Sequence, residues 1–594
     1  MPELSDRAWY IAAGVIMAIG ALLRLWALGV KPMHHDESVN GNFMTSLVRE
    51  GTYQYDPQNY HGPTLYYFSL LIERANGFLN HSDGLSEASL RLLTAIFGIA
   101  TVWLILCMRK SIGKRGTLFA AALVAVSPGA VYYSRDFIHE TLFIFFTLAI
   151  VVCVQLALES LDPAYLVVAA GSAALLFATK ETAPLSLGAI AGALVVQRFW
   201  VVCTRRDRWF NVAIDEMLGW LENTAEALGG PKLLLLYGAI SFVVFSTTFV
   251  LFFTSFFHNR HGFIDAFLAY KYWFHTGVSQ TLHPYFVFFV DGDKIGWLPP
   301  REWVTLLVSL IGIVVVTFWA PESFAFVTAV WGVALFAAYT AIKYKTPWLA
   351  LNATIPLSIT AGYAAAYIWE RGRRAASMLA AVCGVAAIGI AASYILMTYF
   401  NAWTQSDMLG LIPIWIVVAC IVAFLWEYVQ GTVATLVGLC GVVLIAILAW
   451  NAYDLNFNHA DNFEPAENLG CDAAHPDQCK DAEEGWIYVH TSRNIFPILN
   501  EINNVARRTK AGNDLHITVD APEYWPLPWY LRDYKNTGYW GHIIDSDEPV
   551  ILGQQQENDE LTAKLPGKYT RFGDFFIRPG VVLTLWVRND VAHD

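Results

Sequence analysis

Long apolar runs with almost no charge are the feature that most limits how this chain can fold. Runs such as 164–178, 233–253 and 433–450 approach the length of about 17–25 residues that an α-helix needs to cross a bilayer. Only 15% of the 594 residues are charged, whereas roughly a quarter are charged in a typical soluble protein. The sequence therefore predicts a polytopic α-helical membrane protein.

The apolar runs predict about thirteen spans. Their expected bounds are 9–30, 88–107, 117–133, 141–158, 164–178, 185–203, 233–255, 303–319, 324–341, 349–369, 378–397, 411–426 and 432–450. Loops rich in Lys and Arg follow the second, sixth and tenth spans, and such loops mark the cytoplasmic side. Because all three follow even-numbered spans, they agree on a cytoplasmic N-terminus and an extracytoplasmic C-terminus in the cell membrane.

Two long loops, 31–87 and 256–302, are expected on the outer side. The segments 37–48 and 65–78 in the first of them are predicted to form amphipathic helices that lie in the membrane interface. A further amphipathic helix is expected at 210–228 on the inner side.

The segment 451–594 differs from the rest because it holds 12 Lys and Arg against 23 Asp and Glu. Strand and helix signals alternate in it, which predicts a small α/β domain with a partly parallel sheet. The expected elements are 486–491, 494–508, 515–520, 523–534, 549–554, 569–578 and 581–587. The predicted organisation is thus a transmembrane domain over 1–450 and a soluble acidic domain over 451–594, with a short disulfide between Cys471 and Cys479 outside the cytosol.

Four groups of ionisable residues lie where odd-numbered spans end, and therefore on the predicted outer side. They are His34-His35-Asp36-Glu37, Arg135-Asp136 with His139-Glu140, Lys180-Glu181, and Lys343-Tyr344-Lys345. Ionisable side chains are costly to keep near hydrocarbon, so such groups indicate a functional site.

The acidic residues suit proton transfer. Asp36, beside Glu37, follows the first span by about six residues, where a carboxylate can accept a proton from an incoming hydroxyl; the structural alternative is a helix cap. Asp136 is expected to begin the fourth span, with His139 and Glu140 on the same helical face. That face suits an acceptor or a divalent cation, and the alternative is a helix-dipole charge paired with Arg135.

The cationic residues suit a phosphate. Hydrogen bonds from Arg and Lys neutralise the charge that develops on a phosphate leaving group, and the candidates are Arg135, Lys180, Lys343, Tyr344 and Lys345. For each single Lys the alternative is snorkelling to the lipid headgroups. Pro347 forces the residue before it into an extended conformation, which makes a rigid platform. Supporting roles are expected for His35, His61, His139, Glu140 and Glu181.

The order of several short motifs resembles the GT-C superfamily of membrane glycosyltransferases, which includes protein O-mannosyltransferases and aminoarabinose transferases. The motifs are HHDESVNGNF, YHGPTLYY, YSRDFIHET, ATKET and KYKTPWL, and they look closest to a prokaryotic branch described as flippase-activity-associated membrane proteins. The resemblance covers residues 9–450. It implies inverting transfer of a sugar from a polyprenyl-phosphate carrier to an acceptor outside the cytoplasm. It also implies Asp36 as general base, Asp136 as the second acid, and Lys180, Lys343, Tyr344 and Lys345 at the lipid phosphate.

The second acidic motif departs from the superfamily members that act on asparagine, which carry Asp-x-Asp and a metal. Arg135-Asp136 lacks the paired acid, which favours a monosaccharide donor and no strict metal requirement. A divalent cation held by Asp36, Asp136 and His139 is left open. The expected partners are a polyprenyl-phosphate sugar, membrane lipids and an acceptor glycan, lipid or protein, with no nucleic acid.

Two alternatives to a transferase remain. One is a transporter or flippase for lipid-linked sugars, and the other is an accessory subunit without catalysis. Transporters keep their ionisable sites near the bilayer midplane, often in repeated halves. The charges of this chain gather at one rim and no repeat is visible, which favours the transferase.

Overall fold

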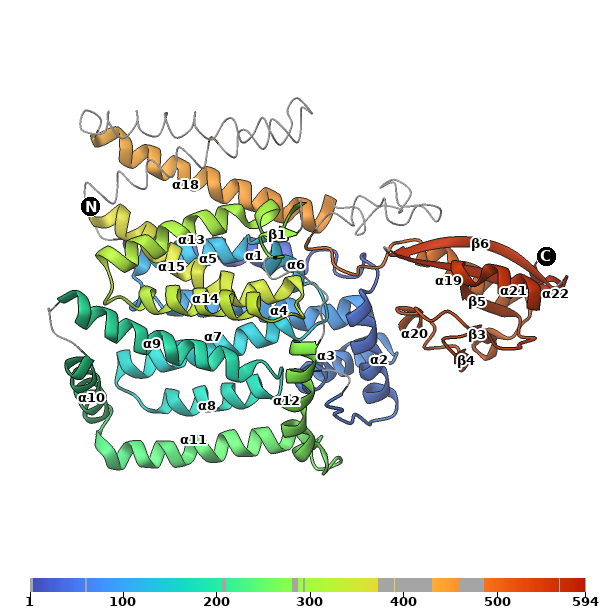
Figure 1. The fold of residues 1–594 in the computed structure, drawn as a ribbon, viewed down its shortest axis with the longest axis horizontal. Coiled ribbons are helices and arrows are strands. Elements are labelled where there is room, and N and C mark those ends of the chain that lie inside the picture. The colour runs from blue at the N-terminus through green and yellow to red at the C-terminus, as the bar shows by residue number, and fades with distance from the viewer. Residues whose placement is uncertain are drawn as a thin grey trace.

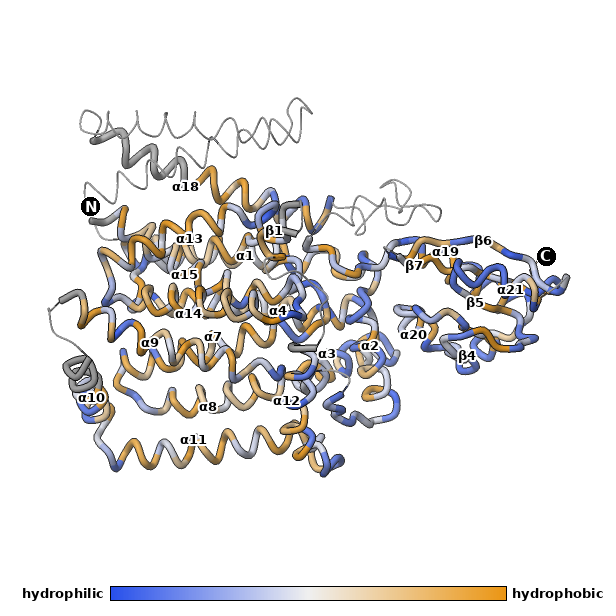
Figure 2. Tube along the Cα trace, in the orientation of Figure 1, coloured by the Kyte–Doolittle hydropathy of each residue, from blue (hydrophilic) through white to orange (hydrophobic). Residues whose placement is uncertain are grey.

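The computed structural model describes residues 4–58, 61–205, 210–279, 287–291, 294–371, 389, 430–458, 485–565, 567–578 and 580–592. Long helices lie side by side in a bundle, and a small sheet domain lies beyond one end of it (Figure 1). Apolar residues dominate the bundle helices, whereas hydrophilic residues gather at the helix ends and in the sheet domain (Figure 2).

Eight helices of the described segments are long and apolar enough to cross a membrane. They are α1 (Asp6–Leu25), α4 (Glu87–Cys107), α7 (Glu140–Ser160), α9 (Ala183–Arg205), α11 (Gly230–Phe253), α13 (Pro299–Trp319), α14 (Phe324–Ala341), and the short turn η1 (Pro347–Ala350) with α15 (Leu351–Arg371). The shorter apolar helix α8 (Ala164–Phe177) and α18 (Gln430–Tyr453) run beside them (Figure 1). A polytopic helical fold with a C-terminal α/β domain is confirmed. Apart from residue 389, the predicted spans 378–397 and 411–426, together with Cys471 and Cys479, lie outside the described residues.

The third predicted span, 117–133, is wrong as a single helix. α5 (Lys114–Ala125) ends, and α6 (Pro128–Tyr133) begins again after a break. Pro128 cannot continue a helix but suits its first position, and the Ser127 hydroxyl accepts the Ala130 N–H at 3.2 Å as the new N-cap. The turn after α6 then carries Arg135 and Asp136 to the end of the bundle.

The C-terminal domain has the strand order β4-β3-β5-β7-β6. Its strands are β3 (His516–Val519), β4 (Asn536–Tyr539), β5 (Val550–Gln554), β6 (Tyr569–Arg578) and β7 (Val581–Arg588). β3 pairs in parallel with β4 and β5, and the remaining pairs are antiparallel, so the sheet is partly parallel as predicted. The amphipathic helix α19 (Ile495–Arg508) buries Ile498, Ile502 and Val505 in the same core as β3 and β5.

The structure of this domain departs from the prediction at 486–491, at 523–534, which is helical only over α20 (Leu527–Tyr530), and at one strand that was not predicted. Residues 486–491 form turns and bends rather than a strand, because their side chains and carbonyls bind the helical bundle instead of the sheet. The strand β4 was missed because its sequence, Asn-Thr-Gly-Tyr, contains two residues that are rare in strands.

Three helices lie across the bundle ends nearest the C-terminal domain (Figure 1). α2 (His35–Arg49) and α3 (Thr64–Asn80) come from the first long loop, and α12 (Gly262–Ser279) comes from the second. α10 (Phe210–Ala227) and the N-terminus lie at the opposite end (Figure 1). Both long loops thus reach the same end of the bundle as the C-terminal domain.

Candidate active site

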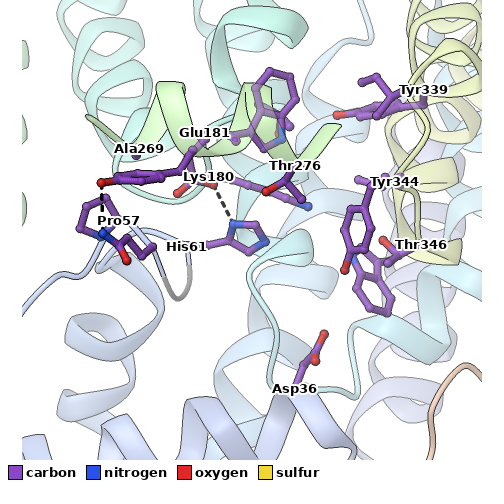
Figure 3. Close-up of a pocket in the computed structure, with 17 residues that line it drawn as sticks. Asp36, Pro57, His61, Lys180, Glu181, Ala269, Thr276, Tyr339, Tyr344 and Thr346 are labelled. Atoms are coloured by element: carbon purple, nitrogen blue, oxygen red, sulfur yellow. Dashed lines mark hydrogen bonds and ion pairs between the residues drawn. The ribbon is translucent and has the colours of Figure 1, made fainter. Parts of the chain in front are cut away.

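A cavity of about 370 Å³ lies at this end of the bundle, within the usual range of roughly 300–1,000 Å³ for small-molecule sites. Its walls are formed by α2, the loop before α3, the turn between α8 and α9, α12, and residues 339–349. The ionisable side chains around it are Asp36, His61, Lys180, Glu181, Tyr272, Tyr339 and Tyr344. Figure 3 shows Asp36 at one side and Lys180, Glu181 and His61 across the cavity from it.

Asp36 reaches the cavity because of how α2 begins. His34 is the N-cap, and its Nδ1 accepts the Asp36 N–H at 3.1 Å. The Glu37 carboxylate accepts the His34 N–H at 2.9 Å, which completes a capping box. The Asp36 side chain lines the cavity and is half-buried, and no described residue donates a hydrogen bond to its carboxylate. It is therefore available to a substrate.

Glu37 points the other way and is fully buried. Its carboxylate accepts two hydrogen bonds from Arg91, at 2.7 and 2.6 Å, and the Phe137 N–H at 2.7 Å. Burial would raise the pKa of Glu37, but the Arg91 guanidinium lowers it to about 2. Glu37 thus joins α2 to α4 and to the turn after α6, and it is not among the described residues that line the cavity.

Asp136 is buried in an ion pair with Lys31. Burial raises the pKa of Asp136, which the Lys31 ammonium only partly offsets. The expected helical face of Asp136, His139 and Glu140 is wrong, because α7 begins at Glu140 and Asp136 lies in the preceding turn. The expected alternative partner is also wrong, since Arg135 donates to the carbonyls of Leu23 and Trp26, at 3.0 and 2.5 Å, and so caps the end of α1.

Lys180 supplies a buried cation at the cavity wall. It follows the last turn of α8, and its Nζ lies 2.5 Å from Oε2 of Glu140 at the start of α7. Glu140 also accepts a hydrogen bond from the Asn352 side chain on α15. The Lys180 ammonium is thus held in place by three different helices while it still borders the cavity.

His61 and Glu181 form a second pair in the cavity wall, with 2.7 Å between Nδ1 and Oε2 (Figure 3). Burial would raise the pKa of Glu181, but His61 and nearby donors lower it below its ordinary value. Tyr344 completes the ring of polar groups. Burial and the Asp36 charge raise the pKa of its hydroxyl to about 12, so it remains a hydrogen-bond donor at neutral pH.

The two lysines beside Tyr344 do not line the cavity among the residues described there. Lys345 is buried and donates to the Thr340 carbonyl at 2.9 Å. Thr346 is extended, with φ −134° and ψ 154°, as the following proline requires. His35 lies outside the cavity as well; burial lowers its pKa to about 4 despite the adjacent Asp36.

A smaller cavity of about 40 Å³ adjoins the first, and Asp36, His61, His139, Glu140 and Lys180 border it. The Nε2 of His139 lies 2.9 Å from the Gly62 carbonyl. Because that nitrogen donates to a carbonyl and Asp136 is paired with Lys31, the proposed metal ligands do not converge. The described segments contain no group of three His, Cys, Asp or Glu side chains suited to a metal ion.

Some cavity residues were not found from the sequence because they carry no charge. Trp348, Thr182, Tyr272 and Tyr339 all line the cavity, but single aromatic and hydroxyl residues are common in membrane helices. Arg91 and Lys31, the partners of Glu37 and Asp136, were also not predicted. Arg91 could have been found, because a charged residue inside the apolar run 88–107 indicates a buried partner.

Comparisons with known proteins agree with this architecture. A family model described as dolichyl-phosphate-mannose-protein mannosyltransferase matches residues 79–214. The structure of ArnT from Cupriavidus metallidurans bound to undecaprenyl phosphate is 14% identical, with 99% of this chain and 100% of that chain covered and a TM-score of 0.58. The apo structure of the same ArnT is 13% identical, covers 98% of each chain and has a TM-score of 0.54. No curated protein matches in sequence.

Both structural likenesses extend over the helical bundle and the C-terminal domain. The chain therefore has the GT-C fold of membrane glycosyltransferases, which confirms the fold that the resemblance of its motifs implied.

Proposed function

Starting from this GT-C fold, we propose that the protein transfers a sugar from a polyprenyl-phosphate donor to an acceptor hydroxyl outside the cytoplasm, with inversion at the anomeric carbon. The donor expected is a monosaccharide, and the acceptor is a glycan, a lipid or a protein. The family model supports glycosyl transfer, and the ArnT complex supports a polyprenyl phosphate as the carrier.

One observation carries the proposal: a free carboxylate and a buried cation border the same cavity. Asp36 has no described hydrogen-bond donor, whereas Lys180 is fixed by Glu140. General-base catalysis needs a carboxylate near the nucleophile, and loss of a phosphate leaving group needs a preorganised positive charge. Asp36 and Lys180 lie on opposite sides of one space, which supports the assignment of these two roles to them (Figure 3).

The proposed reaction assigns each group a step. Asp36 accepts the proton of the acceptor hydroxyl as the oxygen attacks the anomeric carbon from the side opposite the phosphate. The bond between that carbon and the phosphate oxygen breaks, and the electron pair leaves with the polyprenyl phosphate. Lys180 and the Tyr344 hydroxyl donate hydrogen bonds to the departing phosphate, and His61 with Glu181 completes the polar wall.

Glu37 and Asp136 take supporting roles in this proposal. Each is buried in an ion pair, with Arg91 and Lys31 respectively. They fix the loop after α1 against α4 and the turn after α6, and thereby the position of the adjacent Asp36. Arg135 likewise fixes the position of the end of α1.

Purified protein incubated with a panel of polyprenyl-phosphate sugars tests the proposal. Wild type should release polyprenyl phosphate from at least one donor, and Asp36→Asn should lower that rate by about 100-fold or more without changing the unfolding temperature. Glu50→Gln, on the exposed end of the same helix, should be as active as wild type. Full activity in Asp36→Asn would remove Asp36 from the base role, and lipid translocation without any sugar release would contradict the transferase altogether.

A further inference from the structure

The C-terminal domain contacts α2, the helix that carries Asp36, at three places along its length. These contacts lie at the start, the middle and the end of the helix. Each involves residues more than 440 positions away in the sequence.

At the start, the contact acts directly on the cap of the helix. Nδ1 of His34 accepts the Asp36 N–H, so Nε2 must carry the proton of the neutral ring. That Nε2 lies 2.5 Å from the Tyr488 carbonyl and donates to it. The neighbouring Met33 N–H donates to the Tyr530 hydroxyl at 2.9 Å. The C-terminal domain thus fixes both the tautomer and the orientation of the side chain that begins α2.

The segment that supplies the Tyr488 carbonyl is itself anchored to the bundle. The Tyr133 hydroxyl donates to the Trp486 carbonyl at 2.7 Å, and a Cβ on Gly129 would lie only 2.5 Å from the Trp486 ring. The Tyr488 ring packs against Trp348, with 6.0 Å between centroids, and Trp348 lines the cavity. This segment therefore reaches the wall of the candidate site.

In the middle of α2, the Trp529 side chain is fully buried against Gly41. A Cβ on Gly41 would lie 2.6 Å from the Trp529 ring, so only glycine leaves room for it. The Trp529 indole N–H donates to Glu87 at the start of α4 at 3.0 Å. Trp529 packs in the core formed by α2, α3 and α4 rather than in the core of its own domain.

At the end of α2, Arg49 donates to the Arg532 carbonyl at 3.0 Å and to the Asp533 carboxylate at 2.6 Å. This contact is exposed and therefore weak. We infer that the C-terminal domain is a positioning part of the active site, which fixes α2 and through it the carboxylate of Asp36 relative to Lys180. The catalytic consequence rests on the proposed function, whereas the restraint of α2 does not.

The inference predicts a specific kinetic pattern. The Trp529 side chain contacts Gly41 on α2 and Glu87 on α4, whereas Lys180, His61 and Tyr344 lie on other elements, so donor binding should survive the loss of the Trp529 contact. A displaced general base lowers the rate of the chemical step, by about 10- to 100-fold for a shift near 1 Å. Loss of the Trp529 contact should therefore lower kcat and leave the KM for the donor within about twofold.

The test compares full-length variants by hydrogen exchange and by kinetics. Trp529→Ala should speed amide exchange in α2 but not in α19, and should lower kcat as stated. Trp529→Phe should restore part of the protection of α2 from exchange and part of kcat. Trp540→Ala, which removes an exposed tryptophan of the same domain, should behave as wild type. Unchanged exchange in α2, or a raised acceptor KM with wild-type kcat, would overturn the inference.

Gly41→Ala breaks the same contact from the side of α2 and leaves the C-terminal domain unaltered. It should reproduce the effect of Trp529→Ala on α2, which keeps the inference testable if Trp529→Ala also exposes α19. Unchanged α2 exchange in Gly41→Ala would again overturn it. If the wild type transfers no sugar, the proposed function fails, but the exchange of α2 still decides whether the C-terminal domain restrains it.

Discussion

Asp36 and Glu37 are adjacent carboxylates in opposite environments. A helix turns by about 100° per residue, so one side chain faces the cavity while the other is buried against Arg91. The sequence could place the pair at the rim of the membrane domain. It could not say which carboxylate was free, because that depends on a partner 54 positions away.

Glu37→Gln should be strongly destabilising for this reason. It leaves the Arg91 charge buried without its partner, and removing one member of a buried ion pair costs about 3–5 kcal/mol. Thermal unfolding in detergent should show a clear fall in Tm. The double variant Glu37→Gln with Arg91→Met, which removes both charges, should recover much of it. A Glu37→Gln protein as stable as wild type would contradict the structural role.

The same pair predicts an acid sensitivity. The pKa of Glu37 is about 2 in the folded protein and near 4.5 when unfolded. Its contribution to stability is therefore fully present above about pH 4.5 and is lost as the pH falls from there through 2. The Tm should drop over this window in the wild type, and the drop should be smaller in the double variant. Equal acid slopes in the two proteins would refute the assignment.

At the scale of elements, the loop before α3 and the end of α8 are held together by backbone contacts. The Gly62 N–H donates to the Thr179 carbonyl at 3.0 Å, and the Thr64 N–H donates to the Ala178 carbonyl at 3.2 Å. These contacts hold His61 beside Lys180 and Glu181.

Gly62→Ala should disturb this arrangement, because a Cβ there would lie 2.1 Å from the Ala178 carbonyl oxygen. The forced separation should cost about 1–3 kcal/mol of stability and lower kcat/KM for the donor. Gly14→Ala is the control, since no atom lies within 4 Å of its added Cβ. Equal activity of the two variants would show that the close approach of the loop to α8 does not matter to the site.

Elements were predictable where local signals dominate. The apolar runs gave the helices of the bundle, and strand periodicity gave β3, β5, β6 and β7. The strand expected at 486–491 failed because its alternating aromatic residues pack against the bundle instead. The charged clusters marked the correct end of the molecule, but which side chains face the cavity follows from tertiary packing, as Lys180 and Lys345 illustrate.

At the scale of the whole molecule, α2 and α12, which line the cavity, lie at the same end of the bundle as the C-terminal domain, and α10 lies at the other end (Figure 1). The proposed orientation places the cavity and the C-terminal domain on the extracytoplasmic side. In a cysteine-depleted background, Lys535→Cys in the C-terminal domain should react with a membrane-impermeant maleimide on intact cells. Arg109→Cys, in the loop after α4, should react only after the membrane is opened. The reverse pattern would invert the topology and with it the side of the reaction.

The most direct test of the shared cavity is an experimental structure of the full-length protein with a polyprenyl phosphate bound. The phosphate should lie within hydrogen-bond distance of the Lys180 Nζ and the Tyr344 hydroxyl, with the Asp36 carboxylate facing it across the space that a sugar would fill. A phosphate bound elsewhere, with Lys180 still paired only to Glu140 and the cavity empty, would contradict the account.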